Sequence, residues 1–286
     1  MKNLIYFFQF LFIGILFIIF KILGLKLSRI IAGKFFSIFG PFFRSKDIIE
    51  KNISYAFSNV NQEFKKNILN KMWKGYGKIL AEYMFVKNFR EVASEKFLEI
   101  KGQNILEKIK ISNDPVIFVS GHFDNFELMA MHIEKSGIDL AAIYRPLNNN
   151  FLNPLMESIR KKYICRKQVK KGVSGTKEIL KHFKSGTSVA LMIDQRVSQG
   201  IKSLLFGREA FTTTIPAQFV KKFNCKIVPI YIERKSNENF LLEIMEPINF
   251  NNNLTIENIT LKLNQLLEKM ITRNPHQWIW SHNRWK

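Results

Sequence analysis

Cysteine is scarce in this chain of 286 residues, which has only Cys165 and Cys225. The two are far apart and form no Cys-x-x-Cys pair, which excludes a disulfide framework and favours a reducing compartment. Cys165 could act as an acyl-accepting nucleophile, although a small buried residue is the commoner reading of a lone cysteine.

Several cofactor and ligand motifs are also missing. There is no P-loop, no dinucleotide fingerprint and no cysteine–histidine ligand cluster, so we expect neither a cofactor nor a metal. Zinc-finger spacing, an RNP-like stretch and a basic leucine zipper are absent as well, and nucleic acid is therefore not an expected partner.

Acidic residues are few, with 23 Asp and Glu against 44 Lys and Arg, for a net charge of +21. Residues 1–50 carry seven basic and two acidic side chains, so the remaining 236 residues carry +16. A field of that sign attracts anionic lipid headgroups, phosphorylated glycolipids, acidic carrier proteins or nucleic acids. A genome rich in A and T, which enriches Lys together with Ile, Asn and Phe, accounts for part of the excess.

One long apolar run stands at the N-terminus, where Leu4 to Phe20 holds no charge and Ile22 to Leu25 extends the run. Seventeen helical residues rise roughly 25 Å, close to the thickness of a bilayer core. No Ala-x-Ala cleavage site follows, which disfavours a cleaved signal peptide. A spanning or embedded anchor is predicted; a helix lying in the interface, or a hairpin with Ile30 to Phe43, is the alternative.

Basic residues flank this run unequally. Only Lys2 precedes it, whereas six follow: Lys21, Lys26, Arg29, Lys34, Arg44 and Lys46. The positive-inside rule then places the C-terminal side in the cytoplasm. We expect residues 1–45 to form the anchor with its basic flank, and residues 46–286 to form the folded domain.

The rest of the chain alternates between short β-like runs and helical patterns. This alternation predicts an α/β fold with a largely parallel sheet flanked by helices. The expected strands are Val116–Ser120, Leu140–Tyr144, Ser188–Ile193, Lys226–Glu233 and Leu241–Met245. The expected helices are Gln62–Phe85, Glu127–Lys135, Leu152–Lys162, Gly175–Lys184, Pro216–Lys222 and Thr255–Ile271.

His122 and Glu127 lie where the first of these strands gives way to a helix. Ligands are handled at the carboxyl ends of strands in α/β folds, and a histidine held by a carboxylate can take a proton from a hydroxyl. The two side chains converge only if His122 is still in the loop and Glu127 lies in the first helical turn. In the alternative, Asp124 or Asn125 caps the helix, Glu127 completes a capping box with Asp124, and His122 is an ordinary loop residue.

The residues around this pair resemble a known family. His-x4-Glu is similar to the His-x4-Asp/Glu signature of glycerolipid-type acyltransferases, and more narrowly the chain resembles the bacterial lipid A biosynthesis acyltransferases. Supporting blocks follow in the family's order: Gly121–Glu127, Tyr144–Asn149, Asp194–Arg196, Phe206–Gly207 with Thr212–Thr213, and Trp280–Lys286. Arg196 departs from the Asp-Gln-Asp of many relatives.

The resemblance implies transfer of a fatty acyl chain from an acyl carrier protein thioester to a hydroxyl of a lipid A precursor. His122 is then the expected general base, and Glu127 the carboxylate that holds its ring. Acylation of another glycolipid or a phospholipid is one alternative. A non-catalytic membrane protein that binds anionic lipid is the other.

Three more residues are expected at the substrate. Arg145 ends the second β-like run, where its planar guanidinium can bind phosphate or donor oxygens. Asp194 ends the third expected strand and has an open role, and Arg160 lies on a helix that could equally be a solvated face. The clustered Trp278, Trp280 and Trp285 suit either a membrane interface or ordinary packing. The expected location is the bacterial inner membrane, with the catalytic domain in the cytoplasm.

Overall fold

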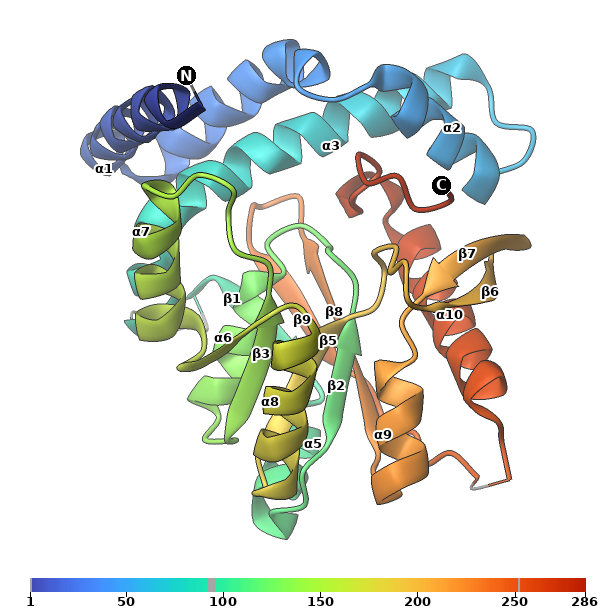
Figure 1. The fold of residues 1–286 in the computed structure, drawn as a ribbon. Helices are drawn as coiled ribbons and strands as arrows, with labels where there is room; N and C mark the ends of the chain where they lie inside the picture. The colour runs from blue at the N-terminus through green and yellow to red at the C-terminus, as the bar shows by residue number, and fades with distance from the viewer. Residues whose placement is uncertain (1, 92–95, 252) are drawn as a thin grey trace.

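A seven-stranded sheet forms the centre of the computed structural model, which describes residues 2–91, 96–251 and 253–286 (Figure 1). From one edge to the other its strands are β1 (Leu98–Lys101), β9 (Phe240–Ile244), β8 (Ile227–Arg234), β2 (Ile117–Ser120), β5 (Ser188–Met192), β3 (Leu140–Tyr144) and β4 (Lys167–Lys170). The five strands from β8 to β4 are mutually parallel, whereas β9 pairs antiparallel with β8, and β1 runs parallel to β9. The predicted fold class is therefore confirmed.

The central strands are apolar because both faces of the sheet are covered. Every residue of β2 is buried. Ile117 and Val119 belong to one hydrophobic cluster, while Phe118 belongs to the other. Successive side chains on a strand point to opposite faces, so these clusters are the two layers between the sheet and its helices.

Helices supply the outer layers on both faces. The cluster around Phe118 includes residues of α5 (Gln103–Ser112) and α6 (Glu127–Lys135). The cluster around Ile117 includes residues of α8 (Val173–Lys184) and α9 (Ile215–Phe223). Helix α10 (Ile256–Arg273) contributes to both. All the expected helices and strands are present, most with ends shifted by one or two residues.

The other elements were not expected or had different bounds. Helix α2 (Lys46–Ala56), α5, β1, β4 and the antiparallel hairpin of β6 (Ile201–Leu205) and β7 (Arg208–Thr212) had no sequence prediction. The helix expected at Leu152–Lys162 is α7 (Leu152–Ile159) followed by a π-helical turn, η4 (Arg160–Ile164). Among the residues described, the remaining short elements are η1 (Gly40–Phe42), η2 (Tyr83–Phe85), α4 (Val86–Glu91) and η5 (Pro275–Gln277).

The N-terminal helix α1 (Lys2–Phe39) and helix α3 (Gln62–Glu82) lie across the top of the sheet in Figure 1. Gly24 has φ 73° and ψ 167°, which breaks α1 into two helical halves. The two helices pack so closely that a Cβ at Gly77 would lie 2.1 Å from the Ala32 carbonyl oxygen. By length and composition alone, this N-terminal segment could span a membrane.

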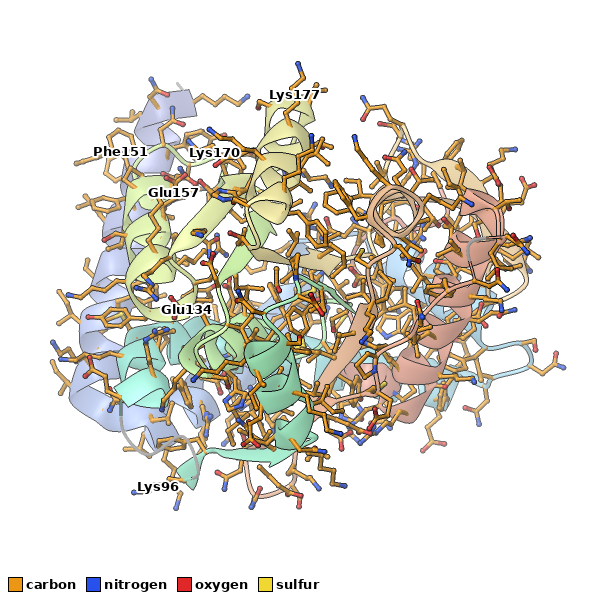
Figure 2. All side chains as sticks on the ribbon, turned by 90° about the horizontal axis from the view of Figure 1, so that it is seen from below. Lys96, Glu134, Phe151, Glu157, Lys170 and Lys177 are labelled. Carbon is orange, nitrogen blue, oxygen red and sulfur yellow. The ribbon has the colours of Figure 1, made fainter. Side chains whose placement is uncertain are left out.

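The second half of α1 is packed against the folded domain. Arg29 and Ala32 are buried there, although both precede the boundary predicted between residues 45 and 46. That boundary stays a prediction. The first half also makes contacts, because the Asn149 amide donates to the Tyr6 carbonyl oxygen at 2.9 Å and Phe151, labelled in Figure 2, packs on Phe7.

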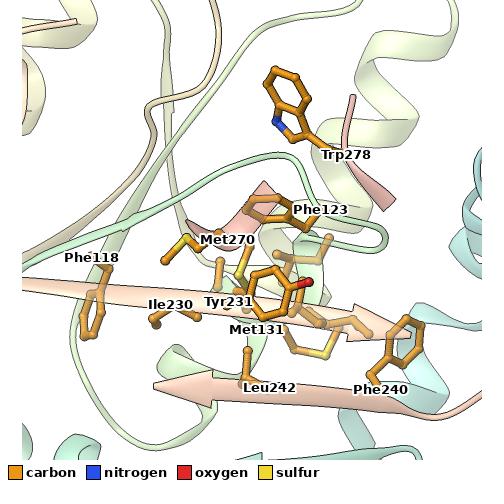
Figure 3. Close-up of a cluster of buried hydrophobic side chains, with 14 of the residues drawn as sticks. Phe118, Phe123, Met131, Ile230, Tyr231, Phe240, Leu242, Met270 and Trp278 are labelled. Carbon is orange, nitrogen blue, oxygen red and sulfur yellow. The ribbon is translucent and has the colours of Figure 1, made fainter. Parts of the chain in front are cut away.

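Aromatic side chains fill the space between β8 and the strand-end loops. Figure 3 shows Phe123 between Tyr231 and Trp278, and the rings of Phe123 and Tyr231 are 5.0 Å apart. Trp278 and Trp280 are at most 1% exposed and pack edge to face. The packing interpretation of these two tryptophans is therefore correct, and the membrane-interface interpretation is wrong for them.

Candidate active site

Sheet register brings His122 and Asp194 together. Strands β2 and β5 are parallel neighbours in which Ser120 is aligned with Met192. Two residues further along each chain, His122 and Asp194 emerge side by side at the carboxyl edge of the sheet. The Ile193 amide still donates to the Ser120 carbonyl oxygen at 2.9 Å, so the alignment persists beyond the strands.

Two hydrogen bonds join these residues. The Nδ1 atom of His122 lies 2.7 Å from one Asp194 carboxylate oxygen, and the His122 backbone N–H donates to the other at 2.7 Å. Burial would raise the pKa of Asp194, but the His122 charge and the hydrogen bonds that Asp194 accepts from His122 and Trp278 lower this pKa to about 2. A carboxylate can only accept, so Nδ1 carries a proton and Nε2 of neutral His122 is left as the basic nitrogen.

Trp278 completes the support of the carboxylate. Its indole N–H donates to Asp194 at 2.9 Å, and both side chains are buried. The Gln195 amide nitrogen lies 3.4 Å from Nε2 of His122, and the Phe126 ring packs on the imidazole. The imidazole is therefore fixed through one nitrogen while the other faces a partly open site.

Glu127 does not hold the imidazole, which corrects the expected geometry. Its Oε1 atom accepts from the Arg160 guanidinium at 2.6 and 2.8 Å and from the Tyr83 hydroxyl at 2.5 Å. The two side chains point in different directions. As the first residue of α6, Glu127 projects toward η4 and the end of α3, while the ring nitrogen turns toward β5.

Arg160 consequently forms a largely buried ion pair in this structure. Its side chain is 13% exposed and ion-paired with Glu127, which excludes the solvated-face alternative. Whether it contacts a substrate stays a prediction. Glu127, Arg160 and Tyr83 together tie α6 to η4 and to η2, the turn that follows α3, beside the His122 loop.

The capping alternative is also corrected. Helix α6 has Phe126 at its N-cap and no side-chain cap, so neither Asp124 nor Asn125 caps it through a side chain, and Glu127 forms no capping box. Asp124 instead adopts a left-handed φ of 36°, a conformation that costs energy for a residue with a side chain. Its carboxylate is occupied elsewhere.

A buried network of four charges holds Asp124 in that conformation. Arg234, at the end of β8, donates to both Asp124 and Glu82, and Arg29 of α1 donates to Glu82 at 2.6 Å. Asn125 donates to the second Glu82 oxygen at 2.8 Å. Two cations and two carboxylates balance, which such burial requires. The network links α1 and α3 directly to the residues beside His122.

Two basic residues follow β3 and β4, at the carboxyl edge of the sheet. Arg145 follows β3, which neighbours β5, and it is exposed. Desolvation and the nearby Arg145 charge lower the pKa of Lys171, while the Asp194 charge opposes that shift. The Lys171 backbone N–H donates to the Tyr144 carbonyl oxygen at 2.8 Å, so Arg145 and Lys171 follow neighbouring strands at the same edge of the sheet as His122 and Asp194. An anionic group of a substrate would be attracted to this edge.

Sequence reasoning missed several members of this site. Trp278 was noted only as part of an aromatic cluster, and Lys171 and Gln195 were given no role. His282 is another: burial lowers its pKa to about 4 even though the Asp194 charge opposes this, so its Nε2 accepts the Arg196 backbone N–H at 2.9 Å. The sequence signal for these residues was the pair of motif blocks Asp194–Arg196 and Trp280–Lys286. The two blocks are in contact in the structure, where Arg196 bonds to His282 and to Lys286.

Two other candidate chemistries can be placed. Cys165 is fully buried and burial raises the pKa of its thiol to about 12, which makes it unsuited to act as a nucleophile. Across residues 2–91, 96–251 and 253–286 there is no cluster of three or more His, Cys, Asp or Glu side chains that could hold a metal.

An α/β sheet with a carboxylate-held histidine at its carboxyl edge suits an enzyme that removes a proton from a hydroxyl. The sequence model of the bacterial lipid A biosynthesis acyltransferases matches residues 1–286, so the chain belongs to this family and is an acyltransferase. It is similar to a lipid A biosynthesis palmitoleoyltransferase of Escherichia coli (strain K12), 23% identical over 86% of this chain and 80% of the relative.

Two more relatives agree. A lipid A biosynthesis lauroyltransferase of the same organism is 23% identical over 85% of this chain and 79% of its own. A lipid A biosynthesis acyltransferase of Haemophilus influenzae is 22% identical over 85% and 78%. The relatives' names differ in acyl chain, so the family supports acyl transfer in lipid A biosynthesis without fixing the chain length.

Proposed function

We propose that this acyltransferase moves a fatty acyl chain from an acyl carrier protein thioester to a hydroxyl of a phosphorylated lipid A precursor. The observation that carries the chemistry is the 2.7 Å contact between Nδ1 of His122 and the buried Asp194 carboxylate. It leaves Nε2 as the base. Family membership supports the lipid acceptor.

The reaction follows from this geometry. Nε2 of His122 accepts the proton of the acceptor hydroxyl as its oxygen attacks the thioester carbon. The tetrahedral intermediate then expels the thiolate, to which the imidazolium returns the proton. Asp194 stabilises the imidazolium, as the carboxylate does in a hydrolytic triad, and the mechanism requires no covalent acyl-enzyme. General-base help of this kind supplies about 10²–10⁴ in rate.

Glu127 and Arg160 support this site without contacting the His122 ring. Because Glu127 binds Arg160 and Tyr83, its role in the proposal is to fix the start of α6 and to orient the Arg160 guanidinium. Arg145 and Lys171 lie at the same edge of the sheet as the base and carry no carboxylate partner among the residues described. We assign them to the anionic groups of donor or acceptor.

The substrate partners fit the charge of the protein. An acidic carrier protein and a phosphorylated glycolipid are both anionic, whereas the chain has a net charge of +21. The apolar helix α1 supports attachment to the inner membrane. The basic residues that follow its apolar run favour a catalytic domain on the cytoplasmic side.

A deletion strain tests this function. Removal of the gene should leave lipid A intermediates that lack one acyl chain, detectable by mass spectrometry of extracted lipid. The wild-type gene should restore the missing chain, and a His122→Ala gene expressed to the same level should not. If instead a phospholipid or another glycolipid lost a chain in the deletion strain, the alternative acceptor would replace the lipid A precursor.

A further inference from the structure

A cavity of about 430 Å³ adjoins the active-site loop and has no role in the reaction just described. It lies between α3, the residues that follow β8, and the segment around η5. Its volume is within the range of small-molecule sites.

The lining of this cavity is strongly basic. It includes Lys71, Lys74 and Lys78 of α3, together with Arg234 and Lys235 at the end of β8. Positions three and four residues apart share one face of a helix, so the three α3 lysines are presented together.

The carboxylates that line the cavity are already neutralised. Glu238 pairs with Lys78 at 2.5 Å, and Asp124 pairs with Arg234 at 2.5 Å. Among the residues that the structure describes, Lys71 and Lys74 have no carboxylate partner. An uncompensated positive charge therefore remains at the cavity wall.

A histidine in the wall supports this conclusion. His276 lines the cavity, and desolvation together with the charges of Lys71 and Lys78 lowers its pKa, while Glu233 opposes the shift. Burial and these cations thus both disfavour the charged imidazolium. A bound anion would oppose the effect of the cations on the His276 pKa, which makes His276 an internal reporter of occupancy.

We propose that this cavity binds a phosphate monoester through Lys71 and Lys74. Ammonium groups on flexible stems act as point charges for phosphate oxygens, and a concave site encloses a single dianionic group. The volume leaves space for the sugar that carries the phosphate. A protein partner would instead meet a broad, flatter surface.

The position of the cavity indicates where the phosphate comes from. Asp124 and Gln277 form part of its wall, and they lie beside His122 and Trp278 in the chain. The Asp124 N–H also donates to the Gln277 carbonyl oxygen at 2.8 Å. The cavity therefore lies behind the loop that carries the base and beside the segment whose Trp278 holds Asp194, so the phosphate is assigned to the acyl acceptor. That assignment, unlike phosphate binding itself, rests on the proposed function.

The first experiment measures binding without turnover. Full-length protein with labelled histidines, in detergent, is titrated with inorganic phosphate at constant ionic strength, and the His276 ring resonance is followed by NMR after assignment with His276→Gln. A saturable shift is expected. Lys71→Gln/Lys74→Gln should weaken phosphate binding about 10-fold. Lys65→Gln/Lys66→Gln removes the same charge from α3 outside the cavity, and should change it by less than about 2-fold.

The second experiment identifies the source of the phosphate. Acyl transfer is measured with a phosphorylated glycolipid acceptor and with the same acceptor after phosphatase treatment. The Lys71/Lys74 variant should raise KM about 10-fold for the phosphorylated acceptor, with kcat little changed, and should leave KM for the treated acceptor unaltered. If the ratio of KM for the phosphorylated acceptor to KM for the treated acceptor were the same in the variant and the wild type, while phosphate binding was still lost, the site would be assigned to soluble phosphate.

Other outcomes overturn the proposal. Absence of a saturable His276 shift, or an equal loss in the two lysine pairs, would mean that the cavity is no phosphate site. Weakened binding of an acidic carrier protein with phosphate binding intact would make this face a protein-docking surface. Failure of the wild-type protein to acylate either acceptor would count against the proposed function alone, because the NMR titration decides phosphate binding independently.

Discussion

At the scale of single residues, a carboxylate 72 positions away in the sequence, and not the one five residues away, holds the histidine. Asp194 is fully buried and receives hydrogen bonds from His122 and Trp278. Glu127 is committed to Arg160 and Tyr83. The two carboxylates should therefore respond differently when each is removed together with His122.

We expect His122→Ala to lower kcat by at least about 10²-fold, and Asp194→Asn to lower it by a similar factor. The double variant should be little worse than either single variant, because the two residues act as one unit. Steady-state kinetics on dispersed substrate measures this. His182→Ala, a histidine substitution on α8 away from the site, is the control and should keep full activity.

Glu127 supplies the contrasting case. Loss of its hydrogen bonds to Arg160 and Tyr83 acts by a separate route, so the factors for Glu127→Gln and His122→Ala should multiply. Coupling of Glu127 to His122 as strong as that of Asp194, in variants that remain folded, would contradict the assignment of the holding carboxylate.

Acid should reveal the stabilising role of the Asp194 carboxylate. Its pKa is lowered to about 2, whereas an unfolded aspartate titrates near 3.9. A lowered pKa contributes stability that is present above the unfolded value and is lost as the pH falls through the folded one. The free energy of unfolding should thus lose ~2 kcal/mol between pH 4 and pH 2. Denaturant titrations followed by tryptophan fluorescence should show a shallower decline in Asp194→Asn over this interval; equal slopes in both proteins would refute the shifted pKa.

At the scale of elements, α1 and α3 form a lid over the carboxyl edge of the sheet. Their contact is backbone to backbone at Gly77, and Arg29 reaches from α1 into the buried charge network. The network continues through Glu82 and Arg234 to Asp124. Separation of the two helices should therefore disturb the loop that carries His122.

Two glycines of α3 offer a matched test of this contact. Gly77→Ala places a methyl group 2.1 Å from the Ala32 carbonyl oxygen, so the helices must move apart, and we expect a loss of about 1–3 kcal/mol of stability. Gly75→Ala meets nothing within 4 Å and should be neutral or stabilising by up to about 1 kcal/mol. Thermal unfolding in detergent compares them. Equal melting temperatures for the two variants would show that the helix contact is not tight in solution.

At the scale of the whole molecule, much of the fold could be predicted from local pattern. β3 and α6 begin and end at the predicted residues. Buried strands and amphipathic helices can be recognised from the pattern of apolar residues in a short stretch of sequence. β1, with alternating exposed residues, and the β6–β7 hairpin gave weaker signals. The order β8-β2-β5-β3 could not be predicted, since it depends on long-range packing. Without that order, the adjacency of His122 and Asp194 was not visible.

The anchor should locate the enzyme without performing chemistry. Deletion of residues 1–24 ends at the break in α1 and keeps Arg29, so the buried charge network survives. We expect only part of the protein to become soluble, with residual vesicle binding that weakens as salt rises. Turnover on detergent-dispersed acceptor should persist. Because Asn149 contacts Tyr6, a folded but inactive truncation would show instead that the anchor helps to build the site.

The most direct test of the central claim is mass spectrometry of the lipid product made by purified protein. The enzyme is supplied with acyl carrier protein thioesters of several chain lengths and a phosphorylated lipid A precursor. Wild-type protein should add one acyl group in ester linkage, and His122→Ala, shown to be folded, should add none at comparable times. No added acyl group with the wild type, or equal product from both proteins, would contradict the assignment of this chain as a His122-dependent lipid A acyltransferase.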